Sequence, residues 1–205
     1  AAIEREEVAH ELVKLHNDGT IDLVDVFLNL RKNEGGSTFF VLRTVFEHAL
    51  PEIESDVMPV IRCVRHLVHE AGQDLAAGTT VDYFTRFLSK ETSRPKQGLS
   101  NIKEEPELLD LLPATLIAGS KVDMPKYLEE TLELTRAENA DTRKQAVFAL
   151  GRLEWSDENK PSEAVYTTLE GILSTETNDA MLSITARTAA TLIKHDPSHA
   201  NRLID

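Results

Sequence analysis

The sequence predicts an all-α protein of about ten helices. Apolar residues recur at helical spacing through almost the whole chain, and no convincing alternation of apolar and polar residues indicates a strand. Aromatic residues make up only 5% of the 205 residues, so Leu, Val, Ile and Ala must form most of the core, as in packed helices. The nine glycines and eight prolines stand mostly between the apolar stretches, where they suit short turns.

The N-terminal part of the chain predicts five amphipathic helices. The first carries Val8, Leu12 and Leu15 at helical spacing, and Asn17-Asp18-Gly19 ends it. The third is apolar around much of its circumference, which is typical of a helix at the centre of a domain. In order, we expect helices at residues 3–16, 21–31, 38–50 and 55–71, and one that begins after Gly78 and contains Val81, Phe84, Phe87 and Leu88.

A polar stretch at residues 91–105 is typical of a connector, since it contains Arg94-Pro95, Gly98 and paired glutamates. We therefore expect three parts, namely an N-terminal helical array at 1–90, a connector at 91–105 and a second helical region at 106–205. A single continuous array over residues 1–205 is the alternative.

The second region begins with a helix from Pro106 to Ala118, which Pro113 should kink or split. Asp123 is a good N-cap for the next helix. Further helices are expected at residues 141–155, from Ser162 through Leu173, and at 179–194.

A repeat is visible in this region. One face of the 141–155 helix is lined by small and apolar residues, namely Thr142, Ala146, Ala149, Leu150 and Leu153. An apolar stripe follows 40 residues later, at Leu182, Ala186, Ala189, Ala190 and Ile193. The preceding helices agree at an offset of 41, because Leu128 corresponds to Leu169 and Leu132 to Leu173. A period near 40 with two helices in each unit is typical of helical repeat arrays.

The order Arg143-x-x-Ala146-x-x-Ala149-Leu150-Gly151-x-Leu153 resembles the second helix of a HEAT repeat, including the HEAT-like repeats of phycobilin-lyase type. The resemblance covers residues 123–195 and implies an α-solenoid of helical hairpins, related to the HEAT and armadillo folds. The second unit departs from the pattern, with Ala190-Thr191 in place of the Leu-Gly step, and the first 120 residues contain no repeat that aligns. Because such solenoids usually hold another macromolecule, the resemblance implies a non-enzymatic protein-interaction scaffold or adaptor.

Candidate partner-binding residues lie opposite the small-residue stripe. Lys144, Phe148 and Trp155 share this second face with Gly151, and the HEAT pattern usually has a polar residue in the place of Phe148. One interpretation is an aromatic patch that binds a partner, with Gly151 leaving a notch between the rings. The other is a second apolar face packed against neighbouring helices. The resemblance adds further residues of the second helices to the same surface: Arg143, Ile184, Arg187 and Thr188.

The charge balance narrows the class of partner. The chain contains 22 Lys and Arg against 35 Asp and Glu, for a formal net charge of −13, and both halves are acidic. Affinity for nucleic acid rests on clustered cations, so this balance argues against a nucleic-acid partner. We expect a protein or peptide partner.

Nothing in the sequence predicts an enzyme, a metal site or a cofactor. Cys63 is the single cysteine, which excludes an intrachain disulfide and argues against a Cys-based zinc site. His66 and His69 are three residues apart on an expected helix and are followed by Glu70, but no third histidine lies nearby and the order is not that of a His-Glu-x-x-His motif. Nucleophile motifs and phosphate-binding glycine loops are absent from the sequence.

Two other functions are alternatives to an interaction scaffold. One is a DNA glycosylase with a HEAT-like fold, in which Trp155 and Asp157 would supply an aromatic ring beside an acid. The other is a sensor or spacer segment of a larger protein, since the chain begins at Ala1 without Met and ends in a helical-looking stretch at 198–205. No apolar run reaches the length of a membrane span, and we expect a cytoplasmic location.

Overall fold

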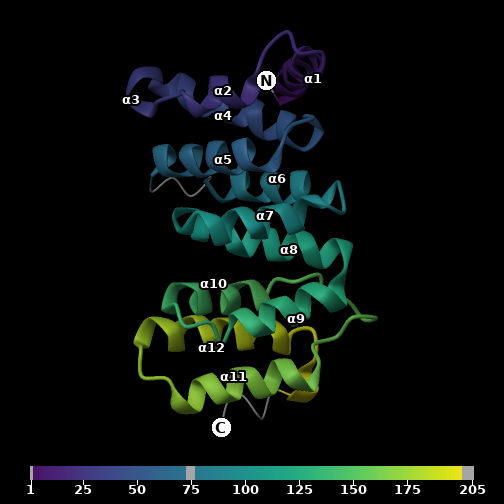
Figure 1. Cartoon of the computed structure of the whole chain (residues 1–205), viewed down its shortest axis with the longest axis vertical. Helices are drawn as coiled ribbons and strands as arrows, with labels where there is room; N and C mark the ends of the chain where they lie inside the picture. Colours follow the sequence, from purple (N-terminus) through teal and green to yellow (C-terminus); the bar gives the residue numbers. More distant parts are fainter. Residues whose placement is uncertain (1, 73–76, 200–205) are drawn as a thin grey trace. The chain divides into compact units, whose positions relative to one another are not determined.

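The computed structural model describes residues 2–72 and 77–199. These residues form twelve α-helices and three short 3₁₀ helices and no strand, which confirms the all-α class (Figure 1). None of the helices in these ranges has the length and apolar character needed to cross a bilayer. The chain divides into two compact units, unit 1 at Ala1–Ala118 and unit 2 at Gly119–Asp205. Residues 200–205 of the expected final stretch lie outside the described residues.

Unit 1 contains the longer succession of helices. Their bounds are α1 (Ala2–Asn17), α2 (Leu23–Leu28), α3 (Lys32–Gly35), α4 (Ser37–Ala49), η1 (Leu50–Glu52), α5 (Val57–Ala71), α6 (Ala77–Ser89), α7 (Arg94–Glu104), η2 (Pro106–Leu111) and α8 (Leu112–Val122). The boundary between these units falls within α8, later in the chain than the division predicted at residues 91–105.

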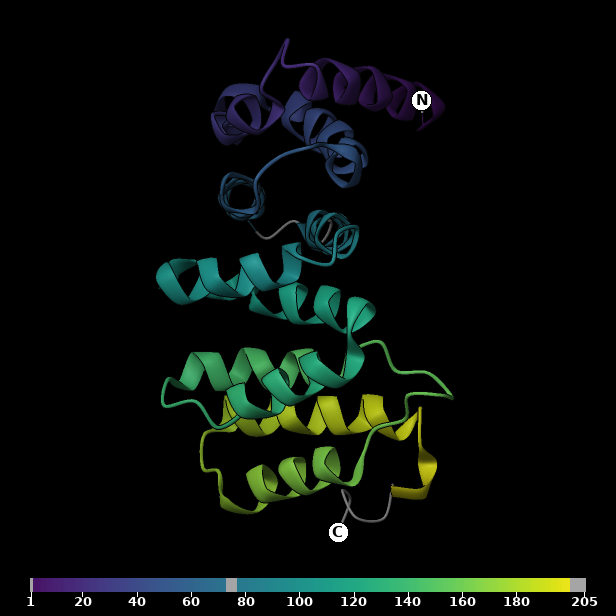
Figure 2. The same cartoon turned by 45° about the vertical axis from the view of Figure 1, so that its right-hand side comes forward.

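The core of unit 1 is built around α5. Its apolar residues recur every three or four positions and are buried, among them Val57, Val60, Val64 and Leu67. This face lets α5 pack against α2, α6, α7 and η2. Figure 2 shows α5 and α6 nearly end-on and side by side.

The predicted connector at 91–105 is wrong, because residues Arg94–Glu104 form α7. The Arg94 guanidinium lies 4.0 Å from the centre of the Phe87 ring and donates to Phe87 O at 3.1 Å, so this cation is buried rather than solvated. A Cβ at Gly98 would lie 3.0 Å from Thr115 Cγ2, so glycine serves helix packing there. The polar composition of the segment therefore did not indicate a loop, since most of its polar side chains lie on the exposed side of α7 and only the Arg94 cation is buried.

The segment around Pro113 agrees with the sequence. The structure has a 3₁₀ helix at Pro106–Leu111 followed by α8, and the change occurs immediately before Pro113. Proline has no N–H and sits best in the first turn of a helix, so it marks the start of a new helix here. The predicted split is confirmed.

Unit 2 consists of two helical hairpins. The first joins α9 (Met124–Leu134) to α10 (Ala140–Leu150), and the second joins α11 (Glu163–Thr175) to α12 (Asp179–Ile193), which the 3₁₀ helix η3 (Pro197–His199) follows. Helix α10 packs on both α9 and α12, and α11 packs on α12. Helices α10 and α12 run in the same direction (Figure 1), so equivalent helices of the two hairpins lie next to each other.

The two hairpins correspond at an offset of 39 residues rather than 40. The N-caps Asn139 and Asn178 accept from Thr142 N at 2.9 Å and from Met181 N at 3.1 Å, respectively. The buried residues of α12 are Met181, Thr185, Thr188, Ala189 and Leu192, each 39 positions after one of the five residues predicted to line the 141–155 helix.

The predicted second stripe is therefore wrong in register, since Ala186 and Ala190 are exposed. The offset of 40 was predicted because it aligns the stripe on the 141–155 helix with apolar residues of the later helix. The structure instead buries two threonines, whose hydroxyls donate to Met181 O at 2.8 Å and Val147 O at 2.9 Å. A threonine satisfied in this way can replace an apolar residue in a helix interface.

Candidate functional site

The candidate site lies on the exposed sides of α10 and α12. Lys144 and Phe148 are spaced four residues apart, which places them on one side of α10, and Arg152 lies in the turn that follows the helix. The Phe148 side chain is 36% exposed, and it is the only exposed large hydrophobic residue among the described residues of unit 2. Lys144 Nζ lies 3.3 Å from Asp141 Oδ1, one turn earlier.

Arg152 covers one face of the Phe148 ring. Its guanidinium carbon lies 3.7 Å from the ring centre, and Nη1 donates to Phe148 O at 3.3 Å. The contact is a cation–π pair at a spacing of i, i+4, and partial burial lowers the pKa of the Arg152 guanidinium from its ordinary value. Sequence reasoning missed Arg152, although an aromatic residue followed four positions later by arginine was a usable signal.

Helix α12 supplies the other side of the site. Thr188 is buried and touches Gly151, where an added Cβ would lie 3.3 Å from Thr188 Cα. This close approach fixes the register of the two parallel helices. Ile184, half-buried one turn before Thr188, and Arg187, exposed next to it, therefore lie beside the Lys144–Phe148 edge of α10. We call Lys144, Phe148, Arg152, Ile184 and Arg187 the α10–α12 surface.

Trp155 is not part of this surface. Helix α10 ends at Leu150 rather than at 155, because the chain turns at Gly151 and Arg152 N donates to Ala149 O at 2.7 Å. Trp155 is 9% exposed, and its Nε1–H donates to Leu150 O at 2.8 Å. The prediction that the Phe148 and Trp155 rings project from the same side of one helix is therefore wrong, since helical spacing applies only where the helix continues.

Two other predicted residues have structural contacts. Arg143 Nη1 donates to Ala137 O at 2.8 Å and to Glu138 O at 2.7 Å, so it holds the turn between α9 and α10. Thr188 is buried at the contact with α10, as described above, and does not reach the surface. Of the predicted residues, Lys144 and Phe148 share one side of α10, and Ile184 and Arg187 lie on the neighbouring helix α12.

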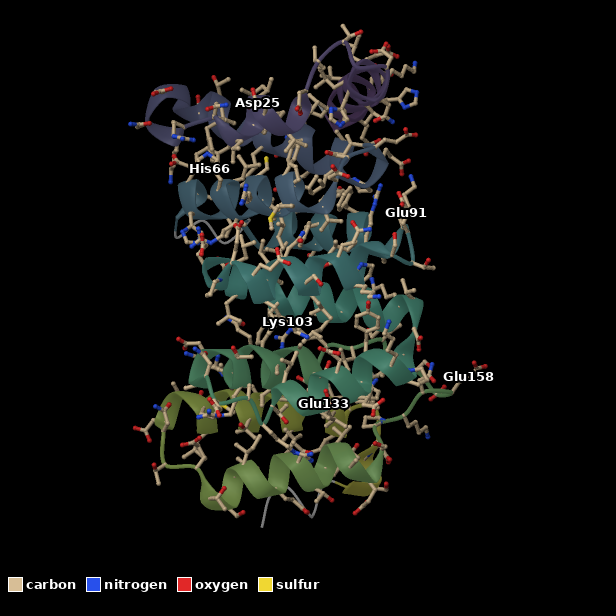
Figure 3. The ribbon with its side chains drawn as sticks, viewed as in Figure 1. Asp25, His66, Glu91, Lys103, Glu133 and Glu158 are labelled. Atoms are coloured by element: carbon tan, nitrogen blue, oxygen red, sulfur yellow. The ribbon has the colours of Figure 1, made fainter. Side chains whose placement is uncertain are left out.

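The histidines of α5 have separate partners. His66 Nε2 lies 2.7 Å from Leu30 O and 2.6 Å from Arg31 Nη1 (Figure 3), whereas His69 Nε2 lies 2.9 Å from Asp110 Oδ2. Glu70 Oε2 accepts from Lys32 N at 2.9 Å. In the two described ranges no three His, Cys, Asp or Glu side chains gather in a way that could hold a metal ion. Cys63 is fully buried, and burial raises the pKa of its thiol.

Two hollows are lined by residues outside the α10–α12 surface. In unit 2, a hollow of about 680 Å³ is lined by the end of α9 and one face of α11, including Arg136, Thr168 and Gly171. In unit 1, a hollow of about 560 Å³ lies at the start of α5, beside Ser93, Lys96 and Ser100. The loop that joins α10 to α11 carries Glu158 outward (Figure 3) and lines neither of them.

No protein-family model, curated protein or solved structure matches this chain. The function must therefore be argued from the residues themselves.

Proposed function

We propose that the chain is a non-enzymatic protein-interaction scaffold built from HEAT-like helical hairpins, and that it holds its partner through the α10–α12 surface. The observation that carries the proposal is the exposure of Phe148. Every other aromatic side chain in the described ranges is buried or half-buried. An exposed ring flanked by arginines has the residue types that are enriched in the centres of protein interfaces.

The packing beneath the surface also supports this function. Small groups meet where α10 and α12 cross, because Gly151 contacts Thr188 and the Thr188 hydroxyl bonds to Val147 O. Such a contact limits sliding of one helix along the other. Side chains on a rigid pair of helices lose less conformational freedom on binding, which favours affinity.

The alternatives receive less support. A second apolar core face would bury Phe148, whereas its side chain is 36% exposed. A glycosylase would need Trp155 at the surface beside Asp157, whereas Trp155 is buried with its N–H bonded to a backbone carbonyl. Among the described residues, no arrangement favours catalysis over binding.

The test is Phe148→Ala, followed by chemical denaturation and by capture of proteins from an extract of the source organism. We expect the free energy of unfolding to fall by about 1 kcal/mol, because an exposed cation–π pair contributes little. Binding of the partner should weaken by about 2 kcal/mol or more, as at an interface hot spot.

The matched control is Val26→Ala, which removes an exposed apolar side chain from α2 in unit 1. This variant should capture the same proteins as the wild type. A loss of stability of about 3 to 5 kcal/mol in Phe148→Ala would instead identify a core residue. Unchanged capture by Phe148→Ala would also contradict the proposal.

A further inference from the structure

The charge of the α10–α12 surface is opposite to that of the chain. The chain has a formal net charge of −13, yet Lys144, Arg152 and Arg187 are all cationic and the surface itself includes no carboxylate. Asp141, which pairs with Lys144, is the only acidic residue of α10, and Asp179 is the only one of α12. Since charges are screened beyond about 8 Å at physiological ionic strength, an approaching group responds mainly to these nearby cations.

Among the described residues, two of these cations have no acidic partner. Within residues 2–72 and 77–199, no carboxylate lies within ion-pair distance of Arg152 or Arg187. Arg152 is nevertheless held in place by the Phe148 ring and by Phe148 O. A positioned guanidinium presents a planar set of N–H donors that matches a carboxylate.

The surface also carries apolar side chains. Phe148 and Ile184 belong to adjacent helices, on the same sides as Arg152 and Arg187. A partner that contacts both the cations and the apolar residues of this surface must carry carboxylates around at least one apolar side chain.

We propose that the α10–α12 surface binds an acidic protein segment that carries an apolar anchor. The proposal rests on the proposed function, and it adds the chemistry of the partner. The anchor packs on Phe148 and Ile184, and carboxylates on either side pair with Arg152 and Arg187. Nucleic acid fits less well, because one face of the Phe148 ring is already covered by Arg152 and few cations are present to neutralise phosphates.

The test uses fluorescein-labelled synthetic peptides and fluorescence anisotropy with the full chain. The probe is an amphipathic peptide with Leu and Phe at helical spacing and Glu at the remaining positions, and the control peptide has Gln in place of every Glu. We expect the Glu peptide to bind about tenfold or more tightly than the Gln peptide, and its affinity to fall as salt is added.

Variants locate the interaction. Arg187→Glu should weaken binding of the Glu peptide about tenfold or more, because it places a carboxylate against the carboxylates of the probe. The matched control is Lys121→Glu, which makes the same charge change at an exposed position on α8. It should change the affinity less than about threefold, because Lys121 is not one of the residues of the α10–α12 surface.

Several results would overturn the inference. Equal binding of the Glu and Gln peptides would exclude charge as the basis of recognition, and an equal effect of Lys121→Glu would mean a non-specific response to net charge. Tighter binding of a labelled DNA duplex, lost in Arg187→Glu, would identify a nucleic-acid site instead. Self-association of the wild type in sedimentation, lost in Phe148→Ala, would identify a second copy as the occupant. If the Glu peptide fails to bind while Phe148→Ala still loses captured proteins, the partner chemistry is wrong and the proposed function stands.

Discussion

The described residues of both units bury hydroxyl side chains, but only those of unit 1 also bury charged side chains. In the described part of the chain, the buried charged residues Arg43, Glu47 and Arg94 all belong to unit 1. In the described part of unit 2, every buried polar side chain is a hydroxyl, on Ser120, Thr131, Thr135, Thr185 and Thr188. The difference indicates two ways of making a helical core from a sequence with few aromatic residues.

Unit 1 uses buried charge as part of its core. Arg43 Nε lies 3.3 Å from Glu47 Oε1 on the next turn of α4, and the Thr80 hydroxyl of α6 donates to the same oxygen at 2.5 Å. Such a pair depends on both partners, because removal of one leaves the other charge buried without compensation.

Unit 2 instead brings its helices close together through small groups. Most of the buried threonines donate to a carbonyl of their own helix, such as Thr131 to Tyr127 O at 2.6 Å, so they pack almost as small apolar residues do. Gly119 faces the ring of Tyr127, where an added Cβ would lie 2.1 Å from the ring carbons. A unit of this kind should tolerate changes of charge better than added volume.

The largest expected effect is that of Glu47→Gln in unit 1. Gln is nearly isosteric and can still accept from Thr80, so the change removes mainly the charge that faces Arg43. We expect a loss of about 3 to 5 kcal/mol in the free energy of unfolding, measured by urea denaturation with far-UV circular dichroism. The control Glu52→Gln breaks an exposed pair with Lys90 and should cost about 0 to 1 kcal/mol. Equal losses of unfolding free energy in Glu47→Gln and Glu52→Gln would show that unit 1 does not depend on its buried charge.

Gly119→Ala should have the next largest effect, and it concerns unit 2. The added methyl group would overlap the buried Tyr127 ring, so we expect a loss of about 3 kcal/mol. Trp155, the sole tryptophan, is buried in unit 2, and its emission therefore reports this transition. The control Gly171→Ala adds the same methyl group on α11 where no atom lies within 4 Å, and it should stabilise the unit by roughly 0.5 to 1 kcal/mol. If Gly119→Ala is as stable as the wild type, unit 2 tolerates added side-chain volume at its close helix contacts.

The smallest expected effects distinguish the two repeat registers. Ala189 is buried and Ala190 is exposed on α12, although an offset of 40 residues predicts that both are buried. Ala189→Leu should cost about 1 to 3 kcal/mol by overpacking, as should Ala149→Leu on α10. Ala190→Leu should change stability by about 0.5 kcal/mol or less, as for other surface positions. Comparable losses for Ala189→Leu and Ala190→Leu would favour the register of 40 over that of 39.

Element type was easier to predict than packing. The helices at 38–50, 55–71 and 179–194 were expected close to their observed bounds, because periodic apolar residues and capping residues act locally. The helix at Arg94–Glu104 was missed, although Pro95, Leu99 and Ile102 recur at helical spacing on its buried face. The contact of the buried Arg94 cation with the Phe87 ring and carbonyl could not be read from the composition of the segment.

Only part of the candidate site was predicted, because helical spacing can be read from the sequence and tertiary contacts cannot. Lys144 and Phe148 share a side of α10 because helical spacing alone determines it. Trp155 lies elsewhere, since the chain leaves the helix after Leu150 and the indole N–H bonds to a carbonyl of the turn. Arg152 belongs to the surface only because its side chain folds back over Phe148.

The sequence by itself determined the all-α class, the split of the helix near Pro113 and the side of α10 that carries Phe148, because each depends on spacing and backbone preferences within a few residues. Only the tertiary structure decided which alanines are buried, which cations are paired and where α10 and α12 touch. Those properties depend on contacts between residues far apart in the chain, such as Thr188 with Val147 and Gly151. A buried threonine and a buried alanine look different in a sequence, yet they occupy equivalent places once the hydroxyl has a carbonyl to bond.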